Sequence, residues 1–260
     1  MDFNTLLIVI LGVVWGSFLT AVIWRVDNLS SIFRSRSRCT SCSEKIAWYD
    51  LIPILSFVML RGRCRKCHKS LSFIYPFVEI ISGIIFYLVY SLYAISWPSL
   101  LLVVIFSLFI VILGHDAIFM VVDDKVVYIA IALVVVYNVV VLHDHLAWVD
   151  LLKSGGLGLF IGIAIPATLV IVSKGRWMGE GDISLGALMG VFLGFPNIIV
   201  AYVLAFALGS VAGLALIAFG RKKIRDPLPF GPFLVPSTVV VFFWGEQIVN
   251  WYLKIAFLGG

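Results

Sequence analysis

Two stretches of the chain place acidic residues at the ends of apolar runs. GHDAIFMVVDD, residues 114–124, contains Asp116, and MGEGDISLGALMG, residues 178–190, contains Asp182. Charged side chains within the membrane are energetically costly and are usually functional. Two carboxyls that lie close together cannot both ionise cheaply, so one keeps its proton while the other can accept a proton from water. Such a pair can activate a water molecule for hydrolysis.

The glycines around Asp182 are compatible with two interpretations. Gly179 and Gly181 leave no side chains beside the acid, which permits an unusual backbone and the close approach of an extended peptide. The simpler alternative is a helix-capping turn in which Asp182 is the N-cap residue of the next helix. The presence of Asp116 at a matching depth favours catalysis, because two acids from separate helix ends form the arrangement that an aspartic peptidase needs.

Three other acids have weaker claims. Asp123 and Asp124 directly precede a lysine, so a solvated pair or a helix cap competes with a functional role. We expect Asp124 to support the site or the substrate. Glu79 lies about two turns inside the second apolar run, where it either binds a substrate group or pairs with Arg61 or Arg63.

All four cysteines fall into two Cys-x2-Cys hooks, CTSC at 39–42 and CRKC at 64–67. This spacing is typical of zinc sites, in which four thiolates surround one tetrahedral ion. Four cysteines leave no open coordination position, so we expect the zinc to be structural. Free or redox-active thiols are the alternative. The predicted ligands are Cys39, Cys42, Cys64 and Cys67.

The elements that position these residues are membrane helices. About 62% of the residues are hydrophobic, whereas soluble domains contain roughly 45–50%. Backbone polar groups in lipid must be satisfied within the segment, which favours helices. The sequence predicts an all-α polytopic protein in a lipid bilayer, with about eight transmembrane helices of which the sixth is short. The predicted spans are residues 4–24, 73–95, 98–114, 126–142, 151–173, 183–195, 197–219 and 233–253.

Three parts follow from this pattern. Residues 1–26 form the first transmembrane helix. The start of this segment carries Asp2 and no Lys or Arg, which argues against a cleaved secretory signal. Residues 27–72 interrupt the apolar pattern and form a small, zinc-ribbon-like cysteine module. Residues 73–260 carry both aspartates and form the membrane-embedded catalytic domain.

Lysine and arginine predict the orientation, because short cytoplasmic loops collect these residues. Of the 19 basic residues, only Lys153 and Lys254 fall on the opposite side when both termini are placed outside. The cysteine module and both acidic stretches then face the cytoplasm. The net charge of +5 is explained by this topology and by anionic lipid, without nucleic acid. The basic residues predicted on the cytoplasmic side include Arg25, Arg34, Arg36, Arg38 and Lys45 in the first loop and Arg221, Lys222, Lys223 and Arg225 in the last.

Taken together, these residues resemble the type IV prepilin peptidases, membrane aspartic proteases of the glycine-x-glycine-aspartate type. The likeness covers nearly the whole chain. It is carried by GSFLTAVIWRV at 16–26, the cysteine module through FVE at 39–79, MGEGDISLGALMG at 178–190 and LPFGPFL at 228–234.

The resemblance implies a specific activity and specific residues. Asp116 and Asp182 fall on the two catalytic aspartates of the family. Its usual proline–aspartate falls on Asp123 and Asp124, where the aspartate is kept and the proline is not. Such enzymes remove the short basic leader from prepilins and pseudopilins, after a glycine, at the cytoplasmic face of the bacterial inner membrane.

A second activity is also implied by the resemblance. Many members methylate the new N-terminal amine with S-adenosylmethionine, and the cysteine module is associated with that activity. The chain has no glycine-rich loop of the dinucleotide-binding kind. The sequence therefore does not locate the methyl-donor site.

Two other functions are compatible with parts of the pattern. Buried acids and glycine-interrupted helices also build the ion paths of proton-coupled transporters. A zinc-stapled membrane scaffold without catalysis would explain the cysteines. The acids gather on one side and no duplicated halves are visible in the sequence, so a carrier is disfavoured.

Overall fold

The structure is a computed structural model that describes residues 2–26, 37–39, 41–142, 148–223, 226 and 228–258. Arg34, Arg36 and Arg225, which we assigned to the cytoplasmic side, lie outside the described residues. The described part is helical, and its only bridge pairings are two isolated ones, so the predicted all-α fold class is confirmed. Seven of its helices are long and apolar enough to cross a membrane. The eighth, α8, is apolar but has only 13 residues.

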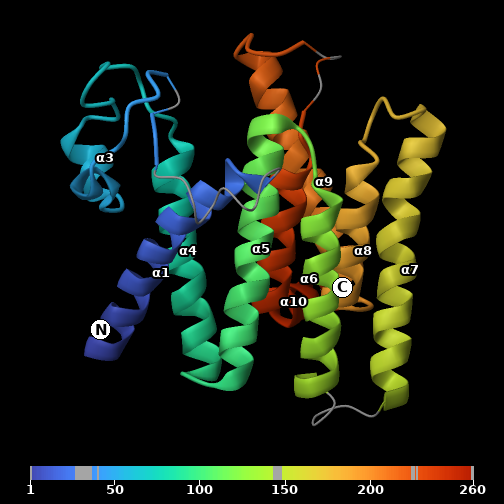
Figure 1. The fold of residues 1–260 in the computed structure, drawn as a ribbon. Coiled ribbons are helices and arrows are strands. Elements are labelled where there is room, and N and C mark those ends of the chain that lie inside the picture. The colour runs from blue at the N-terminus through green and yellow to red at the C-terminus, as the bar shows by residue number, and fades with distance from the viewer. Residues whose placement is uncertain are drawn as a thin grey trace. The chain divides into compact units, whose positions relative to one another are not determined.

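The chain divides into two compact units, Met1–His115 and Asp116–Gly260. The first unit contains α1 (Phe3–Ile23), the 3-10 helix η2 (Trp48–Leu51), α3 (Leu55–Met59), α4 (Ile74–Tyr93) and most of α5 (Trp97–Phe119). The second contains the end of α5, α6 (Asp124–Tyr137), the π-helical turn η3 (Asn138–Leu142), α7 (Trp148–Ser173), α8 (Gly181–Leu193), α9 (Asn197–Ala218) and α10 (Gly231–Leu258) (Figure 1).

In the first unit, α1 and α4 lie side by side (Figure 1). Small residues permit this close approach, as is common between membrane helices. A Cβ atom added to Gly12 would lie 2.7 Å from the Cβ of Phe86, and one added to Gly16 would lie 2.7 Å from the Cα of Glu79. Glu79 therefore lies at one of the close contacts between the two helices. η2 and α3 belong to the cysteine module that connects these helices.

In the second unit, α8 is packed tightly against α7. A Cβ atom on Gly162 would collide with the carbonyl oxygen of Gly186, and one on Gly190 would collide with the carbonyl oxygen of Gly158. The two GxxxG pairs thus bring the backbones into contact. Leu188 on α8 is fully buried. The short helix that carries Asp182 is therefore held at the centre of this unit.

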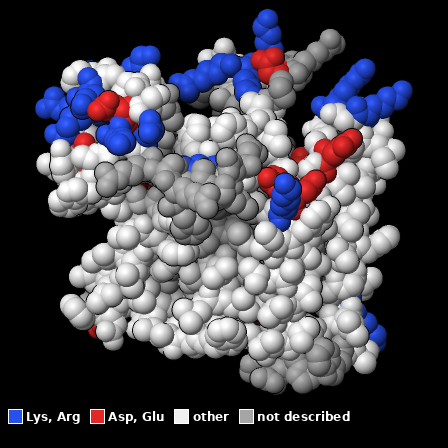
Figure 2. All heavy atoms as spheres, in the orientation of Figure 1, with Lys and Arg blue, Asp and Glu red and all other residues white. Residues whose placement is uncertain are grey.

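The outer faces of the long helices are apolar. On α1, for example, Leu6, Ile10 and Val14 are exposed, as a lipid environment requires. Figure 2 shows that lysine and arginine gather on the cysteine module of the first unit, and that acidic and basic side chains of the second unit gather where α6 and α8 begin. The chain is a multi-pass membrane protein.

Helix α5 ends later than the sequence predicted. We expected its apolar run to end at residue 114, which would leave Asp116 in a loop. The helix continues to Phe119, and the N–H of Met120 still donates to the carbonyl oxygen of Asp116 at 2.8 Å. Met120 then takes a left-handed backbone conformation, with φ 56°. A charged side chain does not end a helix, so Asp116 lies on its final turns.

Candidate active site and metal centre

Asp116 is held by the start of α10. Its side chain is buried, with 5% of its surface exposed. Its Oδ2 accepts a hydrogen bond of 2.9 Å from the backbone N–H of Gly231. A Cβ atom at Gly231 would lie 2.6 Å from that oxygen. Only glycine therefore lets α10 approach this carboxyl so closely.

Gly231 is a residue of the site that the sequence analysis missed. It lies in LPFGPFL, which we quoted for its resemblance but to which we gave no role. A glycine directly before a proline at the start of an apolar helix was the available signal. Nothing in that local pattern identifies a carboxyl 115 positions away as its neighbour.

Asp182 lies in the first turn of α8 and is buried, with 7% of its surface exposed. Its Oδ2 accepts a hydrogen bond of 3.1 Å from the N–H of Gly179. The N-cap residue of α8 is Glu180, whose side chain makes no capping bond. The alternative in which Asp182 is the N-cap is therefore wrong, because its carboxyl turns back toward the glycine turn.

Both aspartates belong to the second unit. A Cβ atom on Gly181 would lie 2.8 Å from the Cβ of Val122, so this glycine lets the start of α8 approach the segment between α5 and α6. Asp182 lies close enough to Asp116 for their charges to interact. The structure thus brings together two buried acids from separate helices. Their catalytic role stays a prediction.

The two acids that follow α5 differ from each other. Asp123 is the N-cap of α6, and its Oδ1 accepts hydrogen bonds from the N–H groups of Lys125 at 2.8 Å and Val126 at 3.4 Å. The helix-cap interpretation thus describes Asp123. Asp124 is exposed in the first turn of α6, where its carboxyl faces solvent.

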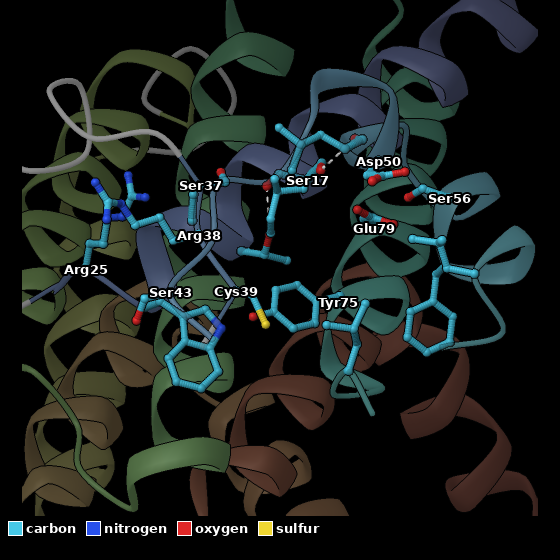
Figure 3. A pocket seen from close by; sticks show the side chains of 18 residues that line it. Ser17, Arg25, Ser37, Arg38, Cys39, Ser43, Asp50, Ser56, Tyr75 and Glu79 are labelled. Atoms are coloured by element: carbon cyan, nitrogen blue, oxygen red, sulfur yellow. Dashed lines mark hydrogen bonds between the residues drawn. The ribbon is translucent and has the colours of Figure 1, made fainter. Parts of the chain in front are cut away.

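Glu79 belongs to the first unit and is 6% exposed. Its Oε2 accepts a hydrogen bond of 2.7 Å from the N–H of Ile54. Of our two interpretations of Glu79, the one in which it pairs with Arg61 or Arg63 is wrong. The ion pairs found among the described residues are Arg65 with Asp50 and Lys66 with Glu44. Glu79 lines a cavity between α1, α4 and the cysteine module (Figure 3).

The four cysteine sulfurs lie within 4.8 Å of one another, and the Sγ atoms of Cys39 and Cys67 are 3.9 Å apart. In a tetrahedral zinc site with Zn–S bonds of about 2.3 Å, the sulfurs are about 3.8 Å apart. The donor set therefore fits one metal ion. Desolvation opposes ionisation of Cys39, but N–H donors of Ser41 and Cys42 lower the pKa of its thiol to about 7.

The described parts of the two Cys-x2-Cys hooks make equivalent backbone hydrogen bonds, 25 positions apart. The Cys39 N–H donates to the Glu44 carbonyl, and the Cys64 N–H donates to the Lys69 carbonyl, both at 2.9 Å. One isolated bridge closes each loop, Arg38 with Lys45 and Arg63 with Ser70. In each loop the residue after the second cysteine is left-handed. This local duplication presents both thiol pairs to one point.

Comparison with known proteins covers both units. The profile described as the bacterial peptidase A24 N-terminal domain matches residues 10–93, and that of the type IV leader peptidase family matches residues 102–214. The chain belongs to the type IV leader peptidase family. In this family member the cysteines and Glu79 fall within the first match, and Asp116 and Asp182 fall within the second.

Several relatives of this chain are named prepilin leader peptidase/N-methyltransferase. The protein of Bacillus subtilis is 29% identical, over 95% of this chain and 97% of that protein. The protein of Legionella pneumophila is 28% identical, over 86% and 77%. The protein of Stutzerimonas stutzeri is 26% identical, over 95% and 93%. No solved structure gave a significant match.

Proposed function

We propose that this chain is a membrane aspartic endopeptidase that removes the basic leader from type IV prepilins or pseudopilins after a glycine. It also methylates the new N-terminal amine. The observation that carries the peptidase proposal is the pair of buried carboxyls, Asp116 and Asp182, with interacting charges. The names of the relatives support the substrate class and the second activity.

In the proposed reaction, Asp116 and Asp182 hold one water molecule between them. One carboxylate takes a proton from the water as it attacks the peptide carbonyl, and the other, protonated, donates to the leaving amine. No covalent bond to the enzyme forms. The N–H groups of Gly231 and Gly179 each occupy one carboxyl oxygen, which fixes the directions in which the remaining lone pairs point.

The substrate is recognised through the membrane. A prepilin presents an apolar helix that enters from lipid, while its basic leader stays in the cytosol. The bond at that boundary then reaches the two acids. Exposed Asp124, at the start of α6, attracts the leader. The distribution of basic residues supports an active site on the cytoplasmic face of the inner membrane and termini on the other side.

The two cofactors belong to the second activity. Cys39, Cys42, Cys64 and Cys67 would hold Zn²⁺, which would stabilise a module that is too small to form a core of its own. S-adenosylmethionine supplies the methyl group. Such an ion would be structural, since four thiolate ligands would leave no open position for catalysis.

The peptidase proposal is tested with the purified full-length chain and a synthetic prepilin. Asp116→Asn and Asp182→Asn each keep the shape of the side chain but remove its acid–base chemistry. We expect leader release to fall by about a thousandfold or more. The matched control is Asp150→Asn, which alters an exposed acid on α7 and leaves the rate unchanged.

Normal leader release by either variant would contradict the proposal. Solute flux through liposomes containing the wild-type chain, without any cleavage of prepilin, would instead favour a transporter. Absence of both activities in a folded, zinc-bound chain would favour a scaffold.

A further inference from the structure

A cavity of about 450 Å³ lies within the first unit, between α1, α4 and the cysteine module (Figure 3). Pockets for small organic ligands measure about 300–1,000 Å³. The peptidase reaction uses none of its lining residues. The cavity includes a buried carboxyl, and its wall contains Cys39. The cavity therefore suits a ligand other than the bond that the peptidase cleaves.

The cavity has an acidic and a basic side. Figure 3 shows Arg25 and Arg38 next to each other on one side, and Glu79 and Asp50 on the other. Asp50 is already held by Arg65, at 2.6 Å. Glu79 is thus the carboxyl that remains for a ligand. A carboxylate has about four acceptor positions, and on Glu79 the N–H of Ile54 and the hydroxyl of Ser17 each use one.

Aromatic rings form another part of the wall. Trp24 and Tyr75 are nearly parallel, with ring centroids 6.5 Å apart and an angle of 16° between their planes. Both line the cavity. A flat heterocycle gains favourable contacts on such faces. The hydroxyls of Ser17 and Thr20 add polar groups on the α1 side.

The loop that contacts Glu79 is strained. Ile54 has φ 61° and ψ −52°, and the N–H of Leu55 donates to the carbonyl of Pro53 at 2.5 Å. This is the geometry of the γ-turn form that is rare and costly, above all for a β-branched residue. Strain of this kind persists only where the surroundings enforce it, and it clusters at ligand sites. Here it aims the Ile54 N–H at Glu79.

We propose that this cavity binds S-adenosylmethionine, with Glu79 facing the sulfonium, Arg25 and Arg38 facing the carboxylate, and Trp24 and Tyr75 facing the purine. The assignment rests on the proposed methyltransferase activity and places it in the first unit. S-adenosylmethionine carries an ammonium, a carboxylate, a positively charged sulfonium and an aromatic purine. A phosphate-bearing ligand would be repelled by Glu79, and a basic peptide would be repelled by the arginines.

The transfer balances without another reactant. The unprotonated amine of the cleaved chain attacks the methyl carbon, so that an N–C bond forms as the C–S bond breaks. The sulfur keeps the bonding electron pair and leaves as a neutral thioether, and the nitrogen releases a proton to water. Glu79 attracts the donor more than the product, whose sulfur no longer carries a positive charge, and this favours exchange after each transfer.

The test measures binding directly. Equilibrium dialysis of radiolabelled S-adenosylmethionine and S-adenosylhomocysteine against the purified, zinc-loaded full-length chain gives a Kd for each. We expect Glu79→Gln to raise the Kd for S-adenosylmethionine by about tenfold or more, and to change the Kd for S-adenosylhomocysteine much less. Arg38→Gln should raise both. The matched controls are Glu44→Gln and Arg221→Gln, at exposed positions outside the cavity, which should change neither.

The outcomes separate this inference from the proposed function. Each variant is also assayed with a peptide that begins with the free amine left by cleavage. Wild-type binding and methylation, with neither Kd altered in Glu79→Gln or Arg38→Gln, would overturn the site and leave the function standing. Cleavage without any donor binding or methylation by the wild type would overturn the methyltransferase function itself. If Glu79→Gln does not fold, Arg38→Gln and ultraviolet cross-linking of the bound donor to the Tyr75 segment decide the matter.

Discussion

The two units orient their buried acids in the same way. In the second unit, backbone N–H groups of Gly231 and Gly179 donate to Asp116 and Asp182. In the first unit, the N–H of Ile54 donates to Glu79. Two acids of the cysteine module differ, because Asp50 and Glu44 form ion pairs with Arg65 and Lys66.

This contrast separates functional acids from structural ones. An ion pair neutralises a carboxylate, and an exposed pair contributes little to stability. The Lys66 ammonium lowers the pKa of Glu44, and Glu44 raises the pKa of Lys66. Both groups therefore stay charged and paired with each other. A backbone N–H instead orients a carboxyl without cancelling its charge.

The units differ in what builds the walls of each site. In the second unit, glycine contacts between helices hold the aspartates, as at Gly162 and Gly186 between α7 and α8 and at Gly231 beside Asp116. In the first unit, the cavity wall is a loop module whose two halves meet at four cysteine sulfurs. Removing a metal should therefore damage one site and spare the other.

Metal removal gives the largest expected separation of the two activities. In Cys64→Ser/Cys67→Ser, the metal loses half of its ligands, and the module loses the folding free energy that binding supplies. We expect loss of zinc, of donor binding and of methylation, while leader release stays near the wild-type rate. Metal analysis, dialysis and mass spectrometry of the pilin product measure the three. A variant that keeps its zinc would refute the ligand assignment, and equal loss of cleavage would show that the two sites depend on each other.

Substitution of Gly231 tests the other site. In Gly231→Ala the new methyl group would meet Asp116 Oδ2 at 2.6 Å, so either the carboxyl or α10 must move. A displacement of about 1 Å costs about a hundredfold in rate, and we expect leader release to fall by about that factor while donor binding is kept. Gly213→Ala is the matched control, since a Cβ atom there meets nothing within 4 Å. Equal rates in the two variants would mean that Gly231 does not position Asp116.

The sequence predicted what depends on local pattern. The apolar runs located the helices to within a few residues, as for α1 and α9, because a bilayer fixes the length and hydrophobicity of a span. The Cys-x2-Cys spacing predicted a four-sulfur cluster. The acids at the ends of α5 and α8 could be singled out because charge is rare at that depth.

Long-range contacts could not be predicted in this way. No local pattern indicates that Gly231 faces Asp116, or that Ile54 rather than an arginine faces Glu79. Both partners are backbone N–H groups, which every residue except proline carries. A side-chain partner leaves a trace in residue type, whereas a backbone donor leaves none.

The smallest expected effects concern Asp123 and Asp124, which are adjacent in the sequence. Asp123 caps α6 through its bonds to the N–H groups of Lys125 and Val126, so Asp123→Ala should lower the free energy of unfolding by about 1 kcal/mol. Leader release by the folded enzyme should not change. Asp124→Ala removes an exposed carboxyl that makes no capping bond, and should instead raise KM for a prepilin with a basic leader while leaving stability nearly unchanged. Thermal unfolding in detergent and leader-release kinetics distinguish the two, and a reversal of these effects would assign the cap to Asp124 and the leader contact to Asp123.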